Sequence, residues 1–235
     1  MEPRLFIIAI IPAAIIILGI YLSDRRDREP FKVLLFTYIL GALTVIPSIV
    51  VEEILITFNI FPGVLSAFYN AFIVAGFTEE FFKRMVVLKY PYKTKFFNEK
   101  LDGIVYSVFA TMGFATVENI IYVAYRYTNN PFIGLYRGIF SVPAHAVFGI
   151  TMGYYLSLAK FDVNLERKRM NMRKSLYMPL IMHGMFDFIL MAEIPELTLI
   201  FVPYVLFLWW LNQRKLASFM YDSKNRVLGL KDKND

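Results

Sequence analysis

Two adjacent carboxylates, Glu79 and Glu80, lie one helical turn before two cations, Lys83 and Arg84, inside an apolar stretch of the chain. Glu79 and Lys83 are four residues apart, as are Glu80 and Arg84, so each carboxylate can reach a cation on its own helix face. Neighbouring residues point about 100° apart, so one glutamate can face a cleft while the other holds a partner. A glutamate balanced in this way can act as a general base near neutral pH. The alternative is two ordinary ion pairs at the rim of the segment.

The chain has two histidines, His145 and His183, and both lie within apolar segments. Asp187 follows His183 by four residues, so the two side chains share a helix face and the carboxylate can orient the imidazole. His145 follows Pro143 by two residues, and a proline inside a helix loosens the turn before it. A loosened turn suits a site that water must enter. Structural hydrogen bonds between buried groups are the alternative for both histidines.

Two further polar pairs lie in apolar segments. Glu118 and Asn119 either belong to the same site, bind the backbone of a substrate, or bond to a neighbouring helix, and the sequence leaves these alternatives open. Glu52 and Glu53 form a second glutamate pair, but no cation follows within a turn. We therefore interpret this pair as a feature of the rim without a catalytic role.

Together these side chains supply what water-activated hydrolysis needs, namely a base, a proton donor and a group that stabilises an oxyanion. No cofactor is expected. Zinc held by His145, His183 and Glu79 is the alternative that the donor types allow, although no His-Glu-x-x-His motif is present. The chain has no cysteine, which excludes thiolate metal sites and a cysteine nucleophile. The predicted catalytic residues are Glu79, Glu80, His145 and His183, supported by Lys83, Arg84, Glu118, Asn119 and Asp187.

Long apolar segments must position these residues. The chain has 235 residues, of which 57% are hydrophobic, and its mean hydropathy is +0.52. About 20 apolar residues in a helix cross the hydrocarbon core of a bilayer. We therefore predict an all-α transmembrane bundle that forms a single membrane-embedded domain over residues 1–222, followed by a polar cytoplasmic tail over residues 223–235. Seven candidate spans are Leu5–Leu22, Val33–Val51, Val64–Leu88, Gly103–Tyr125, Gly138–Ala159, Ser175–Ala192 and Leu197–Leu211.

The distribution of basic residues predicts the orientation of these spans. Basic residues gather in segments 25–32, 89–100, 160–174 and 214–226, which alternate with connections poor in them. Because basic connections stay in the cytoplasm, the N-terminus should lie outside and the C-terminus inside. The net charge of +6 is then explained by topology, and no nucleic-acid partner is expected.

Five ordered motifs in this chain resemble the PrsW family of intramembrane proteases. They are Gly76–Lys83, Asp102–Tyr106, Gly113–Asn119, Pro143–Ala146 and His183–Asp187. The pattern is also similar to the wider superfamily of CAAX-type prenyl-protein endopeptidases and bacteriocin-processing proteins. In that superfamily an asparagine is common where this chain has Asp187, so the role of this side chain is open between binding an oxyanion and orienting His183.

The resemblance implies a multi-pass peptide hydrolase of the cell membrane, with the bilayer and a single-pass membrane protein as partners. It implies a first, site-1 cleavage of a membrane-anchored anti-sigma factor on its extracytoplasmic side, which starts the release of a stress-response sigma factor. It also implies that Glu79 or Glu80 activates water and that the histidines polarise the scissile carbonyl or transfer the proton.

Two alternatives stand beside this interpretation. One is a CAAX-type prenyl-protein endopeptidase, whose site should open to the cytoplasm and hold a lipid. The other is a proton-coupled transporter or channel, because buried Glu, His and Asp side chains also form proton relays. Transporters often contain inverted repeats and broken helices in matching halves, and the sequence contains neither.

Overall fold

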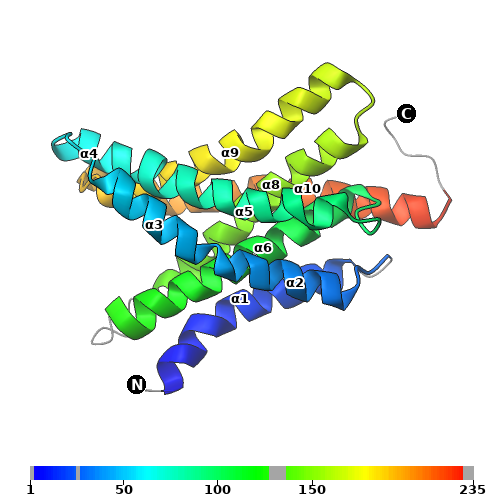
Figure 1. Ribbon diagram of the computed structural model, residues 1–235, viewed down its shortest axis with the longest axis horizontal. Coiled ribbons are helices and arrows are strands. Elements are labelled where there is room, and N and C mark those ends of the chain that lie inside the picture. The colour runs from blue at the N-terminus through cyan, green and yellow to red at the C-terminus, as the bar shows by residue number, and fades with distance from the viewer. Residues whose placement is uncertain (1–2, 25–26, 127–135, 230–235) are drawn as a thin grey trace.

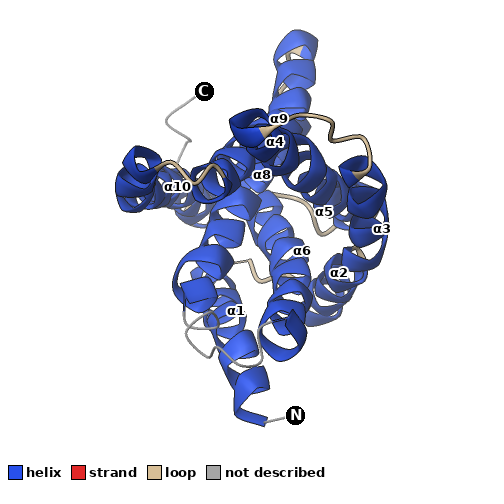
Figure 2. Cartoon of the chain, turned by 90° about the vertical axis from the view of Figure 1, so that its left-hand side faces the viewer, coloured by secondary structure: helices blue, strands red, loops and turns tan. Residues whose placement is uncertain are grey.

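The computed structural model describes residues 3–24, 27–126 and 136–229, and these residues form helices and connecting segments without a strand (Figure 2). The predicted all-α class is confirmed. Arg25 and Arg26 of the first basic segment, and residues 230–235 of the predicted tail, lie outside the described residues. The helices are α1 (Pro3–Ser23), α2 (Phe31–Leu43), α3 (Val45–Ile56), α4 (Gly63–Tyr69), η1 (Asn70–Phe77), α5 (Thr78–Lys89), η2 (Pro91–Lys93), α6 (Lys100–Ile120), η3 (Ile121–Arg126), η4 (Arg137–Ser141), α8 (Val142–Phe161), α9 (Leu165–Met191) and α10 (Pro195–Val227).

The seven predicted apolar segments all coincide with helical backbone, apart from single residues at Thr44 and Ala192. Among the described residues, four helical stretches are long and apolar enough to cross a membrane, and Ala9–Ser23 is a shorter apolar helix. The predicted third and sixth spans contain the charged and polar residues of the candidate site, which lower their hydropathy. Seven spans and the orientation of the termini stay predictions. The four stretches are Phe31–Ile56, Lys100–Val123, Arg137–Phe161 and Pro195–Val227.

Helix α6 lies in the middle of the bundle and contacts α1, α2, α8 and α10 (Figure 2). Its side chains are buried without interruption from Leu101 to Thr116. Large apolar side chains are instead exposed on the outer faces of α2, α3 and α10, as lipid contact requires. The bundle thus places polar chemistry at its centre and hydrocarbon at its surface.

Helices α6 and α8 touch through their backbones. A Cβ added to Gly153 of α8 would lie 2.1 Å from the carbonyl oxygen of Gly103 of α6, and one added to Gly103 would lie 2.7 Å from the carbonyl oxygen of Gly153. Small residues permit this approach, which is typical of helix packing in membranes. The contact brings the helix that carries Glu118 against the helix that carries His145.

Two π-helical segments run directly into helices that carry the candidate site. η1 continues into α5 just before Glu79, and η4 continues into α8 just before His145. π-helical turns are rare and occur often at functional sites, because the wider turn changes the direction of the side chains that follow. Pro143 lies in the first turn of α8, so the predicted loosening of the backbone before it corresponds to η4.

The C-terminal helix α10 extends to Val227, so residues 223–227 of the predicted tail continue this helix. Arg226 near its end forms ion pairs with Asp27 and Glu99. These contacts attach the C-terminal end of α10 to the connection before α2 and to the start of α6. Figure 1 shows the C-terminal end of α10 at the same end of the bundle as the start of α2. The predicted domain boundary at residue 222 stays a prediction.

Candidate active site

A cavity of about 610 Å³ lies between α3, η1, α5, α6, η4, α8 and α9. Its wall combines ionisable side chains with an apolar surface that contains several phenylalanines. A partly open cavity of this kind, with a small number of converging polar groups, is typical of a binding site. The ionisable residues in its wall are Glu52, Glu79, Glu118, Arg137, His145, His183 and Asp187.

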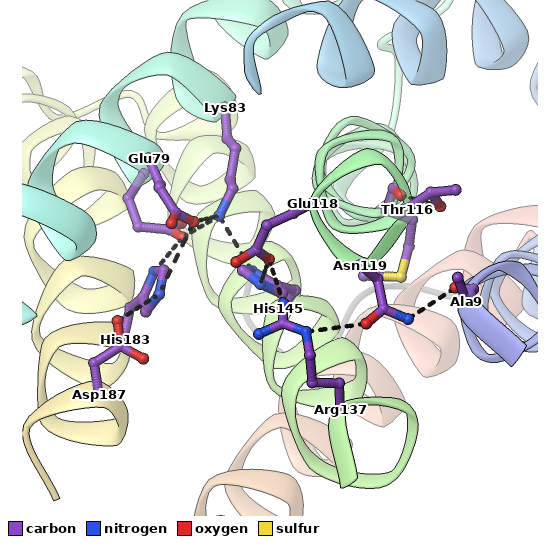
Figure 3. A network of polar contacts seen from close by, with 12 residues as sticks. Ala9, Glu79, Lys83, Thr116, Glu118, Asn119, Arg137, His145, His183 and Asp187 are labelled. Carbon is purple, nitrogen blue, oxygen red and sulfur yellow. Dashed lines mark hydrogen bonds and ion pairs between the residues drawn. The ribbon is translucent and has the colours of Figure 1, made fainter. Parts of the chain in front are cut away.

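Lys83 is the centre of the polar network (Figure 3). Its Nζ atom lies 2.8 Å from Oε2 of Glu79, 3.0 Å from Oε1 of Glu80 and 3.2 Å from Nδ1 of His145. The side chain is fully buried, and the ammonium lies 4.1 Å from the centre of the Phe114 ring. A buried ammonium is tolerated only where charged partners replace water, and the two carboxylates provide them.

Arg84 does not pair with Glu80, so this part of the prediction from i, i+4 spacing is wrong. The Nε of Arg84 donates to Oγ of Ser175 at 2.8 Å, and its guanidinium donates to the carbonyl oxygen of Met172 at 2.9 Å. Glu80 is three residues from Lys83, a spacing that also places side chains together on a helix. Lys83 therefore forms ion pairs with both carboxylates, and Arg84 links α5 to α9 through hydrogen bonds.

The ring of His145 is fixed at both nitrogens. An ammonium offers only N–H donors, so Nδ1 of His145 must accept from Lys83. The other nitrogen, Nε2, then carries the proton and donates to Oε2 of Glu118 at 2.9 Å. This pattern describes a neutral imidazole in a single tautomer, whose position is set by α5 on one side and α6 on the other.

His183 faces carboxylates with both nitrogens. Nδ1 lies 3.0 Å from Oε1 of Glu80, and Nε2 lies 3.3 Å from Oδ2 of Asp187 and 3.9 Å from Oε2 of Glu79. Carboxylates accept hydrogen bonds, so both ring nitrogens are placed to donate. A Cβ added to Gly184 would lie 2.4 Å from the ring of Phe72, so close packing of α9 on η1 brings His183 to the two glutamates.

Glu118 contacts His145 directly and so belongs to the polar network, whereas the side chain of Asn119 hydrogen-bonds to Arg137 and α1. Oε2 of Glu118 lies 3.0 Å from the Arg137 guanidinium as well as contacting His145. Asn119 accepts from Nε of Arg137 at 3.0 Å and donates to the carbonyl oxygen of Ala9 at 2.9 Å. Asn119 is fully buried and supports Arg137 and α1. Figure 3 shows these contacts running from Ala9 through Arg137 to His145.

Arg137 and Glu52 line the cavity, although Arg137 was not predicted to belong to the site and Glu52 was interpreted as a residue of the rim. Arg137 lies next to a connection that the predicted topology places outside the cell. The positive-inside rule does not explain a basic residue there, and this is the signal that could have identified Arg137. Glu52 lines the cavity together with Glu79, whereas its neighbour Glu53 is exposed to the surroundings. The sequence around Glu52 contains no nearby cation, so it gives no sign that Glu52 lines the cavity.

The donor types of the site suit a metal ion. Glu79, Glu80, His145 and His183 each offer one ligand atom, and these atoms lie within 4.8 Å of one another. Carboxylates and imidazoles bind zinc, and metal-binding histidines usually donate their other nitrogen to a carboxylate, as these two do to Glu118 and Asp187.

The space between these donors, however, is occupied by a side chain. Nζ of Lys83 lies within 3.2 Å of Glu79, Glu80 and His145. Zinc needs oxygen and nitrogen ligands at about 2.0–2.2 Å, and it would meet a second positive charge in the same space. The arrangement of side chains therefore does not fit a bound metal ion.

Sequence comparison identifies relatives of the whole chain. The model of the PrsW family intramembrane metalloproteases matches residues 29–211. "Protease PrsW" of Clostridioides difficile (strain 630) is 40% identical over 230 residues, which cover 97% of each chain. "Protease PrsW" of Bacillus subtilis (strain 168) is 34% identical over 88% of this chain and 91% of its own. The protein of the same name from Oceanobacillus iheyensis is 37% identical over 85% and 88%, respectively. No solved structure matches the chain.

Proposed function

Because the chain belongs to the PrsW family and is a multi-pass, membrane-embedded protease, we propose that it makes the first cut in a membrane-anchored anti-sigma factor, using water activated by Glu79. The observation that carries the chemistry is the convergence of Glu79, His145 and His183 on one cavity. Their ligand atoms lie within 4.8 Å of one another. A water molecule in the cavity can hydrogen-bond to Glu79, because this carboxylate lines the cavity wall and a hydrogen bond spans about 2.6–3.2 Å.

Glu79 is better placed than Glu80 to be the base. Glu79 lines the cavity, whereas Glu80 is fully buried behind it. Oε1 of Glu80 is shared between Lys83 and Nδ1 of His183. Glu80 is therefore a positioning residue that holds the lysine and one histidine, and Glu79 is the carboxylate that water can reach.

The reaction needs one proton to move twice. Glu79 takes a proton from the water, and the water oxygen attacks the scissile carbonyl carbon. Glu79 then gives that proton to the nitrogen of the leaving amine as the C–N bond breaks. His183 lines the cavity, and the nearest carboxylate oxygen to its Nε2, on Asp187, is 3.3 Å away. This N–H can turn toward the developing oxyanion, while Asp187 keeps the ring oriented.

The direction of the cavity supports a cut on the extracytoplasmic side. Ile56, Tyr136 and Met191 all line the cavity. Ile56 and Met191 end α3 and α9, Tyr136 directly precedes η4, and each lies next to a connection predicted to lie outside. A site that opens on that side favours an anti-sigma factor over a prenyl-protein substrate, which would enter from the cytoplasm. The substrate class itself comes from the family resemblance.

The test is co-expression with a tagged single-pass anti-sigma factor, followed by immunoblotting for its shortened form. Glu79→Gln, His145→Ala and His183→Ala should each abolish the fragment while the protease is still inserted in the membrane. Glu53→Gln is the matched control, because this exposed glutamate lies outside the cavity wall. Normal cleavage by Glu79→Gln would refute the assignment of the base, and absence of cleavage by the unaltered chain would refute the substrate class.

A further inference from the structure

The Lys83 ammonium has the coordination of a bound cation. It has three N–H groups, and three acceptors surround it at 2.8, 3.0 and 3.2 Å, on Glu79, Glu80 and His145. The fourth bond of the nitrogen is to its own side-chain stem. Three of the four side chains that could hold a metal ion therefore already hold this nitrogen.

The two histidines are oriented as if for a metal ion, with a carboxylate on the far nitrogen of each. The carboxylate of Glu118 accepts a hydrogen bond from Nε2 of His145, and that of Asp187 lies beside Nε2 of His183. The Nδ1 lone pair of His145 is the one that a metal would use, and it accepts from Lys83 instead. The ring of Phe114, 4.1 Å from Nζ, is a further close contact of the ammonium.

We propose that the ammonium of Lys83 is the resident cation of this site and stands where a metal ion would bind. The intact chain then binds no stoichiometric zinc between Glu79, Glu80, His145 and His183. Removing the ammonium leaves two carboxylates and two imidazoles facing one another, which is a zinc site. The inference concerns the resting protein and holds whichever substrate is cut.

The experiment measures metal content, so its result is independent of any cleavage assay. The full chain is purified in detergent without a chelator, incubated with excess zinc chloride, desalted, and analysed by mass spectrometry for zinc. The unaltered chain should retain no stoichiometric zinc. Lys83→Met should retain about one zinc ion per chain, because methionine is unbranched and one atom shorter than lysine, so it removes the charge and vacates the position of the ammonium. Adding His145→Ala to this variant should abolish the binding.

Lys83→Arg is the matched control, because it keeps a positive charge in the site and should bind no zinc. Zinc should raise the melting temperature of Lys83→Met and leave that of the unaltered chain unchanged, since a ligand stabilises the state that binds it. One zinc per unaltered chain, lost on His145→Ala or His183→Ala, would overturn the proposal even if Lys83→Met fails to fold. A folded Lys83→Met chain that binds no zinc would also overturn it.

Discussion

The Nε2 atom of His145 lies 2.9 Å from Oε2 of Glu118, so a carboxylate of α6 fixes the ring carried by α8. Glu118→Ala would leave the N–H of His145 and the guanidinium of Arg137 without this acceptor. A buried donor left unpaired costs about 1–3 kcal/mol, and the loss of an oriented ring should lower the cleavage rate on the order of 10². Glu118→Gln should retain more activity, because its amide oxygen can still accept from Nε2. Cleavage rates and melting temperatures of the two variants, measured in detergent, test this, and equal rates for Glu118→Ala and the unaltered chain would contradict it.

Substitution of Glu79 should mainly lower the cleavage rate, and substitution of Glu80 should cause the larger drop in melting temperature. Glu79→Gln removes the proposed base and one of the two ion pairs of Lys83, so the cleavage rate should fall by about 10²–10⁴ and the melting temperature should fall as well. Glu80→Gln removes a partner of the buried Lys83 and of His183, and breaking a buried ion pair costs about 3–5 kcal/mol. The larger drop in melting temperature should therefore belong to Glu80→Gln. The opposite order would show that the two roles have been exchanged.

The free energy of unfolding should fall as the pH rises from acid to alkaline values, because the buried carboxyl group of Glu29 loses its proton. Glu29 lies just before α2 and accepts a hydrogen bond from the hydroxyl of Tyr106. Burial and the nearby charge of Asp102 raise the pKa of Glu29 from 4.5 to about 9. A group with a raised pKa in the folded state contributes fully below its unfolded pKa, and this contribution is lost as the pH rises through its folded pKa.

Melting temperatures measured between pH 5 and 9 test this dependence, since that window lies between the unfolded pKa of 4.5 and the folded pKa of about 9. Glu29→Gln keeps an oxygen that can accept from Tyr106 and should flatten the curve. Part of the slope at the acid end should remain in this variant, because burial also raises the pKa of Asp24 to about 6. A Glu29→Gln curve parallel to that of the unaltered chain would be evidence against Glu29.

The contact between α6 and α8 should not tolerate a methyl group. Gly153→Ala would place a Cβ 2.1 Å from the carbonyl oxygen of Gly103, so the two helices would have to separate. Overpacking of this kind costs about 1–3 kcal/mol, and it would also move His145 relative to Glu118. Gly19→Ala on α1 is the matched control, because nothing lies within 4 Å of its Cβ position. Melting temperatures should fall for Gly153→Ala and hold or rise for Gly19→Ala, and an unchanged Gly153→Ala chain would contradict the close contact.

Much of the candidate site could be predicted from the sequence, because charges are rare in apolar segments and therefore informative. Glu79, Glu80, His145, His183 and Asp187 all meet in the structure. The spacing within one helix also predicted the contacts of Glu79 with Lys83 and of His183 with Asp187. The helical segments and the all-α class followed from hydrophobic runs alone.

What could not be predicted depends on contacts between helices. The i, i+4 spacing paired Lys83 with Glu79 alone. The structure shows that Lys83 also holds Glu80 on its own helix and, through the packing of α8, His145. Arg84 was assigned to Glu80, but α9 supplies better partners for it. Arg137 reaches Glu118 from a π-helical turn, whose geometry does not follow the ordinary helical period that sequence patterns use.

The nitrogen that Glu79, Glu80 and His145 surround belongs to the polypeptide itself. A protein that uses a metal ion has to acquire it from the cell after synthesis, in competition with every other protein that binds the same metal. Lysine is instead incorporated during translation, and its ammonium is in position as soon as α5 packs against α8. The supply of this positive charge is therefore independent of the nutritional state of the cell.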